Sequence, residues 1–348
     1  MKNEPNVNKK NIKNHIKEKY GIDVEKLTFV PIGEIAYSYL LKASNKDQYF
    51  LKIYELNRLT ENKLHALDFS LSIAHQLNQE MKINQVIYPI KTENGLLKTE
   101  FDNLEIVILS YVEGDMVSEK QSKTNEFMMK LGELLARIHQ ATNTLNLEGG
   151  KSLDLDISFR KDLLASLKEA TECVTSEDKN YNKLQKMLKP QMDNILQSLI
   201  YLEELTEKIK EKNKLELVIC HTDPIRHNTL INIEGTIHLV DWDGATLAPF
   251  EQDIWFFLNE KNLEELIRSY KQIREIDKIN EDFVVFLFYK RVLEDLTDWI
   301  YRMLFEEISK EQMKSDFEGL EEDVLPFLPN MKKIEEELRK NARKWVKI

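Results

Sequence analysis

The chain has 348 residues and a formal net charge of −11, with 49 Lys and Arg against 60 Asp and Glu. At about 100 to 200 residues per domain, this length predicts two domains or two lobes. Hydrophobic residues make up 42% of the chain, which supports a folded core and excludes a disordered protein. The acidic balance argues against nucleic-acid binding, which needs clustered cations, and suits a small cationic partner.

Cysteine content and hydropathy indicate the compartment. Only Cys173 and Cys220 are present, so the sequence predicts no disulfide framework and a reducing environment. No run of about 18 apolar residues occurs, and the first twenty residues are polar where a signal peptide needs an apolar core. We therefore expect a cytoplasmic protein without membrane association.

The first third of the chain shows mostly strand-like patterns. A polar amphipathic stretch at residues 11–20 comes first, and apolar positions at helical spacing occupy residues 60–79. Alternating or continuous apolar runs separated by turn residues predict strands in the following ranges: 27–32, 37–43, 48–54, 85–91, 96–101 and 104–111. The sequence therefore predicts a small antiparallel sheet that carries a helix.

The pattern changes near residue 113, after which helical periods dominate. They begin at residues 127–139 and include a long charged segment at 180–214, which we interpret as one solvated helix. Short apolar runs return only between residues 215 and 247. The prediction is an α+β fold with lobes at residues 1–112 and 113–348.

The segment 215–247 places polar side chains directly after short strands. Asp223 and Asn228 follow one strand, and Asp241 follows the next. Carboxylate and amide oxygens are the ligands that Mg²⁺ prefers when it also binds phosphates. Phosphoryl transfer also needs a carboxylate that positions the attacking hydroxyl. Each of these residues could alternatively be a turn former that bonds its own backbone, although their joint spacing favours the site.

Lys52 interrupts an apolar strand, where a lysine is poorly placed unless a negative charge awaits it. Kinase-like folds use such a strand lysine to contact nucleotide phosphates and hold it with a carboxylate from the following helix. We expect Asp68 to be that carboxylate, with Glu61 as the second choice. The alternative is an edge-strand lysine whose ammonium reaches solvent.

Together these motifs resemble the aminoglycoside phosphotransferase and choline kinase superfamily. The resemblance includes His221-x-Asp223 with Asn228, then Asp241-Trp242-Asp243, and it extends over nearly the whole chain. Further segments are similar to the spectinomycin phosphotransferase branch: 218–223, 242–249 and 291–295. The resemblance implies a two-lobed, protein-kinase-like fold, with a small antiparallel-sheet N-terminal lobe that binds nucleotide and a mainly helical C-terminal lobe.

The resemblance also implies a role for each matching residue. Asp223 would be the catalytic carboxylate, Asn228 and Asp241 the Mg²⁺ ligands, and Lys52 the contact to the phosphates of ATP or GTP. Asp253 would stabilise the catalytic loop, and His221 would pack within it. The nucleotide would contact the following further residues: Gly33 and Ser38 in the N-terminal loop, and Ser110, Tyr111 and Val112 at the hinge.

The sequence departs from the family pattern at two places. Thr222 stands where the family usually has Gly, and the nucleotide loop from Gly33 to Ser38 contains a single glycine. These changes bear on efficiency and nucleotide preference rather than on the reaction class. Asp243 has three open interpretations: a metal ligand, a substrate contact or a turn cap.

We therefore expect an ATP-dependent kinase that phosphorylates a hydroxyl on a small cationic aminocyclitol, an activity of the antibiotic-resistance type. Acidic residues that could meet such a substrate, or form internal ion pairs, are Glu251, Glu294, Asp295 and Asp298. Two alternatives remain open: a kinase for choline, a sugar or homoserine, and a degraded, spore-coat-like binding protein that keeps the fold. Zinc binding through Cys220, His221 and His227 has too few suitably placed ligands. The oligomeric state is left open.

Overall fold

The computed structural model describes residues 4–5, 7–32, 36–56, 61–150, 152–172, 178–211, 215–276 and 278–348, without the side chains of 61–65 and 172. The chain forms two compact units. Unit 1 contains Met1–Leu153, Leu217–Asp253 and Lys261–Glu275, and unit 2 contains Asp154–Glu216, Ile254–Glu260 and Ile276–Ile348.

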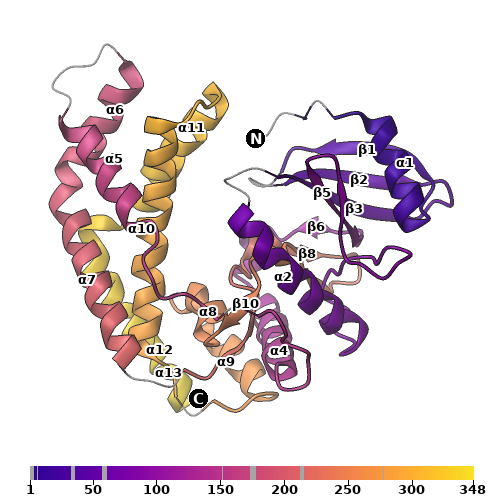
Figure 1. Ribbon diagram of the computed structural model, residues 1–348. Helices are drawn as coiled ribbons and strands as arrows, with labels where there is room; N and C mark the ends of the chain where they lie inside the picture. Colours follow the sequence, from indigo (N-terminus) through magenta and orange to yellow (C-terminus); the bar gives the residue numbers. More distant parts are fainter. Residues whose placement is uncertain are drawn as a thin grey trace. The chain divides into compact units, whose positions relative to one another are not determined.

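Unit 1 begins with an antiparallel sheet of the strand order β1-β2-β3-β5-β4 (Figure 1). Its strands are β1 (Val24–Val30), β2 (Tyr37–Ala43), β3 (Gln48–Glu55), β4 (Thr99–Phe101) and β5 (Leu104–Ser110). These ladders confirm the predicted antiparallel sheet. Residues at alternate positions share a face, as Tyr39 and Leu41 of β2 and Leu51 and Ile53 of β3 do in one buried cluster.

A helix packs on each face of this sheet. Ile12 and Ile16 of α1 (Lys9–Tyr20) are buried against the face that carries Leu51 of β3. On the other face, Leu67 of α2 (Glu61–Gln79) is buried beside Tyr54 of β3. Because successive strand residues point to opposite faces, Lys52 lies on the same face as Tyr54.

The strand predicted between α2 and β4 is wrong, because this segment is an extended connector with isolated bridges. Leu239 N donates to Gln85 O at 2.8 Å, and Ile90 N donates to Ile108 O at 2.7 Å. Pro89 has no N–H and cannot extend a regular ladder. The connector thus links the large sheet to the strand that precedes Asp241.

Two small antiparallel sheets and a few helices complete unit 1. One sheet has the order β6-β8-β9, and the other pairs β10 with β7. The strands are β6 (Asp115–Met116), β7 (Val218–Cys220), β8 (Thr229–Ile231), β9 (Ile237–Leu239) and β10 (Thr246–Ala248). The helices are α3 (Glu119–Ser122), α4 (Asn125–Ala141), α8 (Glu251–Ile254), which ends in unit 2, and α9 (Leu263–Lys271).

Unit 2 is helical. Its helices are α5 (Arg160–Glu172), α6 (Lys179–Leu188), α7 (Met192–Glu211), α10 (Glu281–Phe305), α11 (Lys310–Gly319), α12 (Met331–Ala342) and α13 (Lys344–Lys347). The single helix predicted at 180–214 is wrong. A 3-10 turn, Lys189–Gln191, separates α6 from α7, because Pro190 has no N–H for an α-helical bond.

The predicted α+β class is confirmed by this antiparallel sheet and the helical remainder.

Ion pairs with buried carboxylates link the helices of unit 2. Arg302 on α10 donates two hydrogen bonds to Asp316 on α11, at 2.9 and 2.7 Å. A search of the described helices found none with the length and hydropathy needed to cross a membrane. The lobe division at residues 112 and 113 stays a prediction.

Candidate active site

The loop between β7 and β8 carries Asp223 and Asn228. The Asn228 side-chain amide donates to Asp223 Oδ2 and to the Asp223 carbonyl oxygen, both at 2.9 Å. Asn228 ends the 3-10 turn η2 (Arg226–Asn228), whose backbone closes the loop through a bond from Asn228 N to Ile225 O of 2.9 Å. The Asp223 carboxylate is therefore held from its own loop.

A fully buried carboxylate stabilises the start of this loop. Asp253 accepts hydrogen bonds from the backbone N–H of His221 at 2.9 Å and of Thr222 at 2.7 Å. His139 Nε2 lies 3.1 Å from the same carboxylate. Hydrogen bonds to a buried carboxylate are strong because the group is removed from water. This arrangement agrees with the supporting role expected for Asp253.

His139 extends this network into α4. Its Nδ1 lies 2.6 Å from the hydroxyl of Tyr270 on α9, and burial lowers the pKa of His139. A neutral imidazole with its proton on Nε2 satisfies both contacts, donating to Asp253 and accepting from Tyr270. Cys220 Sγ lies close enough to His139 and Asp253 for the three side chains to hold a metal ion. The Cys220 thiol, however, donates to the carbonyl oxygens of Ala248 and Pro249, so we interpret the group as part of a hydrogen-bonded core rather than a metal site.

The ladder between β8 and β9 brings Asn228 and Asp241 to the same edge. Thr229 is paired with Leu239, and Val240 N donates to Asn228 O at 3.0 Å. Asp241 follows in left-handed backbone, with a φ of 64°. Left-handed backbone is uncommon for a residue with a side chain and occurs often at functional sites.

Lys52 reaches this edge from β3. Its Nζ lies 2.5 Å from Asp241 Oδ1 and 2.8 Å from Asp243 Oδ2, and its side chain is only 10% exposed. Burial opposes the charged lysine, but the two carboxylates outweigh it, so the pKa of Lys52 is raised. The ammonium in turn lowers the pKa of Asp241. Lys52 is thus a buried cation with two acidic partners.

The expected pair between Lys52 and Asp68 is not formed in the described structure. Asp68 lies 3.1 Å from Lys98 Nζ, which also lies 2.5 Å from the buried Glu105. Helical spacing could not reveal this, because Lys98 and Glu105 come from the strand region beyond α2. The side chain of Glu61, the second choice, lies outside the described residues.

The predicted nucleotide contacts that the structure describes lie on the sheet that carries Lys52 or directly after it. Ser38 is paired with Lys52 in the β2–β3 ladder and is buried. At the end of β5, Ser110 N donates to Tyr88 O at 2.8 Å, and Tyr111 is 37% exposed. Val112 packs against the apolar cluster on the α2 face. Gly33 lies outside the described residues.

Asn228 and Asp241, which lie at the same edge of the β8–β9 pair, could together bind a divalent cation. The Asn228 amide nitrogen is used by Asp223, so its Oδ1 is the atom left for a metal. The Asp241 side chain is 49% exposed and already attracts one cation, the Lys52 ammonium. Amide and carboxylate oxygens are hard ligands of the kind that Mg²⁺ takes.

Two residues of this site have roles that the sequence did not assign. Asp243 had three open interpretations, and the structure places it against Lys52. Tyr54 lies at the end of the predicted strand 48–54, and its hydroxyl donates to Asp243 Oδ2 at 2.7 Å. The signal that could have found Tyr54 is its position two residues after Lys52 on one strand face.

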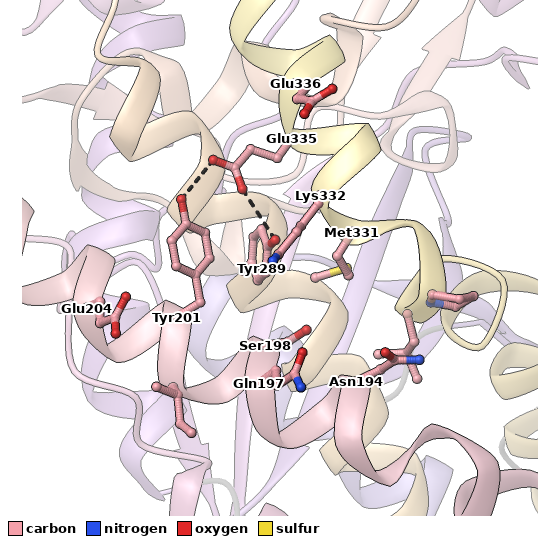
Figure 2. A pocket seen from close by; sticks show the side chains of 13 residues that line it. Asn194, Gln197, Ser198, Tyr201, Glu204, Tyr289, Met331, Lys332, Glu335 and Glu336 are labelled. Atoms are coloured by element: carbon pink, nitrogen blue, oxygen red, sulfur yellow. Dashed lines mark hydrogen bonds between the residues drawn. The ribbon is translucent and has the colours of Figure 1, made fainter.

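Unit 2 contains a separate pocket of about 660 Å³ between α7, α10 and α12 (Figure 2). Glu335 lies on its wall and accepts hydrogen bonds from Tyr201 at 2.8 Å, Tyr289 at 3.4 Å and Arg339 Nε at 2.8 Å. This carboxylate is therefore already satisfied by protein groups. The described residues predicted for phosphoryl transfer all lie in unit 1.

Comparison with known proteins defines the class. Residues 26–279 match the phosphotransferase enzyme family known as APH. Because the match covers most of the chain, the protein belongs to this family of small-molecule phosphotransferases, and the predicted family is confirmed. A comparison with curated protein sequences gave no match.

Solved structures share the fold at low sequence identity. The chain is similar to spectinomycin phosphotransferase APH(9)-Ia in complex with ADP and spectinomycin, with 19% identity and a TM-score of 0.75, covering 96% of this chain and 100% of that one. The amicoumacin kinase hAmiN has 13% identity and a TM-score of 0.60, covering 97% and 94%. Choline kinase LicA from Streptococcus pneumoniae has 16% identity and a TM-score of 0.51, covering 90% and 98%.

Proposed function

We propose that the protein is an ATP-dependent kinase that phosphorylates a hydroxyl group of a small cationic aminocyclitol of the spectinomycin type. The observation that carries the proposal is the arrangement in unit 1 of the Asp223–Asn228 pair, Asp241 and the buried Lys52. Family membership supports the reaction class. In this proposal the protein works in the cytoplasm and confers resistance to the antibiotic.

Each side chain has a role that follows from its chemistry. Asp223 accepts a hydrogen bond from the acceptor hydroxyl and orients it. It takes the hydroxyl proton as the new bond to the γ-phosphorus forms and the bond from that phosphorus to the bridging oxygen breaks, which releases ADP. Lys52 contacts the phosphates as a fixed positive charge. Asn228 Oδ1 and Asp241 would hold Mg²⁺, which when bound neutralises charge on the nucleotide phosphates. Ser38 and the segment Ser110–Val112 line the side of the site that takes the nucleotide, ATP or GTP.

The acceptor is inferred from the charge of the chain and from its fold likeness. The net charge of −11 favours a cation, and the fold likeness to an enzyme solved with spectinomycin supports an aminocyclitol. Of the acidic residues first considered, Asp295 is paired with Arg291 at 2.7 Å. Its charge is therefore balanced within unit 2, so it is a weaker candidate for meeting a cationic substrate.

Two alternatives make different predictions. A choline, sugar or homoserine kinase would use the same phosphoryl-transfer residues with another acceptor, and the likeness to a choline kinase fold keeps this alternative open. A degraded binding protein would not need an intact set of Lys52, Asp223, Asn228 and Asp241. The pairing of these groups in one site argues for a working enzyme.

The direct test measures ADP release from purified protein with Mg²⁺ and ATP across spectinomycin, aminoglycosides, choline, homoserine and neutral sugars. Turnover with spectinomycin and little with choline is the expected result. Turnover only with choline, homoserine or a sugar would move the acceptor to the first alternative. Expression in a sensitive bacterium should raise spectinomycin resistance.

Replacing Asp223 tests the catalytic assignment. Asp223→Ala should reduce turnover by at least about 10²-fold, the usual contribution of a positioned proton acceptor. ATP affinity should stay within about twofold, because the carboxylate acts on the acceptor rather than on the nucleotide. The matched control is Asp115→Ala, which removes an exposed carboxylate of unit 1. Equal turnover in Asp223→Ala and the parent would refute the assignment.

A further inference from the structure

The carboxylate of Asp243 is shared between a cation and a neutral donor. Its Oδ2 accepts a hydrogen bond from Tyr54 at 2.7 Å and lies 2.8 Å from Lys52 Nζ. Both donors are buried, since Tyr54 is 2% exposed as a whole residue and the Lys52 side chain is 10% exposed. Because water has little access to these donors, exchanging either bond for one to solvent is costly.

The local fold brings the three groups together. Lys52 and Tyr54 are two residues apart on β3 and therefore share a face. Asp243 lies in the turn η3 (Trp242–Gly244), which follows the left-handed backbone of Asp241. The indole of the buried Trp242 donates to Leu239 O at 3.1 Å and fixes this turn to β9.

The two carboxylates next to Lys52 are not equivalent. Asp241 pairs with Lys52 through one oxygen and belongs to the proposed metal site, so nucleotide and metal compete for both members of that pair. Asp243 holds Lys52 through an oxygen that also accepts the Tyr54 hydrogen bond. Lys52 has three N–H donors, so one can turn to a phosphate while another stays on Asp243.

Asp68, the carboxylate of α2 that the sequence favoured as the partner of Lys52, is engaged elsewhere. Asp68 on α2 pairs with Lys98, and Lys98 is also held by Glu105, whose side chain is 4% exposed. Buried Glu105 of β5 pairs with Lys98, which directly precedes β4, and Lys98 pairs in turn with Asp68. Among the described side chains, Asp243 therefore takes the role that was expected for Asp68.

We infer that Asp243 is the lasting carboxylate partner of Lys52 through nucleotide binding, and that Tyr54 is a positioning residue that holds Asp243 in this role. The inference rests on the proposed function. Without the Tyr54 hydroxyl, Asp243 loses one of its two hydrogen-bond donors, and its carboxylate can turn toward the proposed Mg²⁺ site at Asn228 and Asp241. Lys52 then loses its alignment with the phosphates, and affinity for the nucleotide falls.

Calorimetry with AMP-PNP and Mg²⁺ tests the inference. Tyr54→Phe should weaken AMP-PNP binding about tenfold, the usual effect of losing a hydrogen bond to a charged group, and Asp243→Asn should weaken it further. Slow hydrolysis of ATP should show a raised KM with kcat within about twofold, whereas damage to the fold would lower kcat. The controls are Tyr49→Phe, on the opposite face of β3, and Asp68→Asn; both should bind like the parent.

A second measurement does not depend on the nucleotide. The rate at which an amine-reactive reagent labels Lys52 in the ligand-free protein, followed by mass spectrometry, should rise several-fold in Tyr54→Phe and in Asp243→Asn, but not in Asp68→Asn. Unchanged labelling and unchanged affinity in the first two variants would overturn the inference. A parent protein that binds no nucleotide would instead contradict the proposed function, and labelling alone would then decide the inference.

Discussion

Thr222 stands where the family usually has glycine, and its backbone conformation is strained as a result. Its φ is 78°, a left-handed conformation that suits glycine and strains a β-branched residue. The strained residue is held from both sides, since its N–H donates to Asp253 at 2.7 Å and its carbonyl accepts from Gln252 at 3.4 Å. The family's usual glycine at this position therefore has a backbone reason.

Thr222→Gly should raise the free energy of unfolding by about 1 kcal/mol. Relief of left-handed strain is about 1–2 kcal/mol, and the greater freedom of glycine in the unfolded chain offsets part of it. The hydroxyl contributes little, because its bond to Gly244 O is long at 3.3 Å. Urea unfolding checks the value, with Thr222→Ala as the control that removes the hydroxyl but keeps Cβ. A glycine variant less stable than the alanine variant would contradict the strain argument.

The site residues differ in how far sequence alone could predict them. Asp223, Asn228 and Asp241 lie within one short segment, so strand ends and spacing predict their proximity. Asp243 lies 191 residues from Lys52 along the chain, and no local pattern connects them. The prediction of Asp68 as the partner of Lys52 is wrong. Helical spacing shows on which face of α2 Asp68 lies, but it cannot show that Lys98, from a later segment, competes for its carboxylate.

At the scale of elements, α4 and α9 are brought into close contact at Gly132. A Cβ on Gly132 would lie 2.5 Å from Leu266 O and would also clash with Ser269 Oγ. The backbone carbonyl cannot move away as a side chain could. This contact lies seven residues, about two turns, before His139 on α4, so it also sets how α4 presents the histidine to Asp253.

Gly132→Ala should lower the free energy of unfolding by about 1–2 kcal/mol. Alanine favours an isolated helix by about 1 kcal/mol over glycine, but overpacking costs about 1–3 kcal/mol and the added backbone clash puts it at the upper end. Chemical denaturation measures the difference. Ser269→Ala combined with Gly132→Ala should recover only part of the loss, because Leu266 O remains. A stabilised Gly132→Ala variant would show that α4 and α9 can separate freely.

His139 makes the stability of unit 1 sensitive to pH. Its folded pKa lies below the ordinary value because of burial, so between the two values the unfolded chain binds more protons. Stability contributed by the neutral ring is therefore present above about pH 6.5 and is lost as pH falls below it. His139→Gln, which can keep both hydrogen bonds, should reduce the slope by up to about 1.4 kcal/mol per pH unit.

Urea unfolding at several pH values between 5 and 8 measures this slope. His15, His75 and His238 also have lowered pKa values, so the variant should retain part of the slope. The exposed His227 provides the control, and His227→Gln should follow the parent curve. Identical slopes for His139→Gln and the parent would show that another group carries the dependence.

At the scale of the whole molecule, the sequence predicted the fold class and family but not the grouping of segments. Unit 1 combines the first 153 residues with two later segments, and unit 2 combines three segments of its own. Local hydropathy could show where strands give way to helices near residue 113. It could not show that residues 217–253 pack with the first part of the chain, because that depends on long-range bonds such as Leu239 N to Gln85 O.

The net charge of −11 should raise the rate at which the protein associates with a cationic acceptor. A strongly acidic protein attracts a cationic molecule over distances up to the Debye length, about 10 Å at 0.1 M salt and about 3 Å at 1 M. If spectinomycin is the acceptor, as proposed above, its kcat/KM at saturating Mg²⁺ and ATP should therefore fall several-fold between 0.05 and 0.5 M NaCl, while kcat changes less. The control is a neutral acceptor or, if none is turned over, a less charged aminocyclitol, whose kcat/KM should change less than twofold. Equal salt sensitivity for cationic and neutral acceptors would show that charge does not guide the acceptor, and would leave shape and hydrogen bonding to explain its selection.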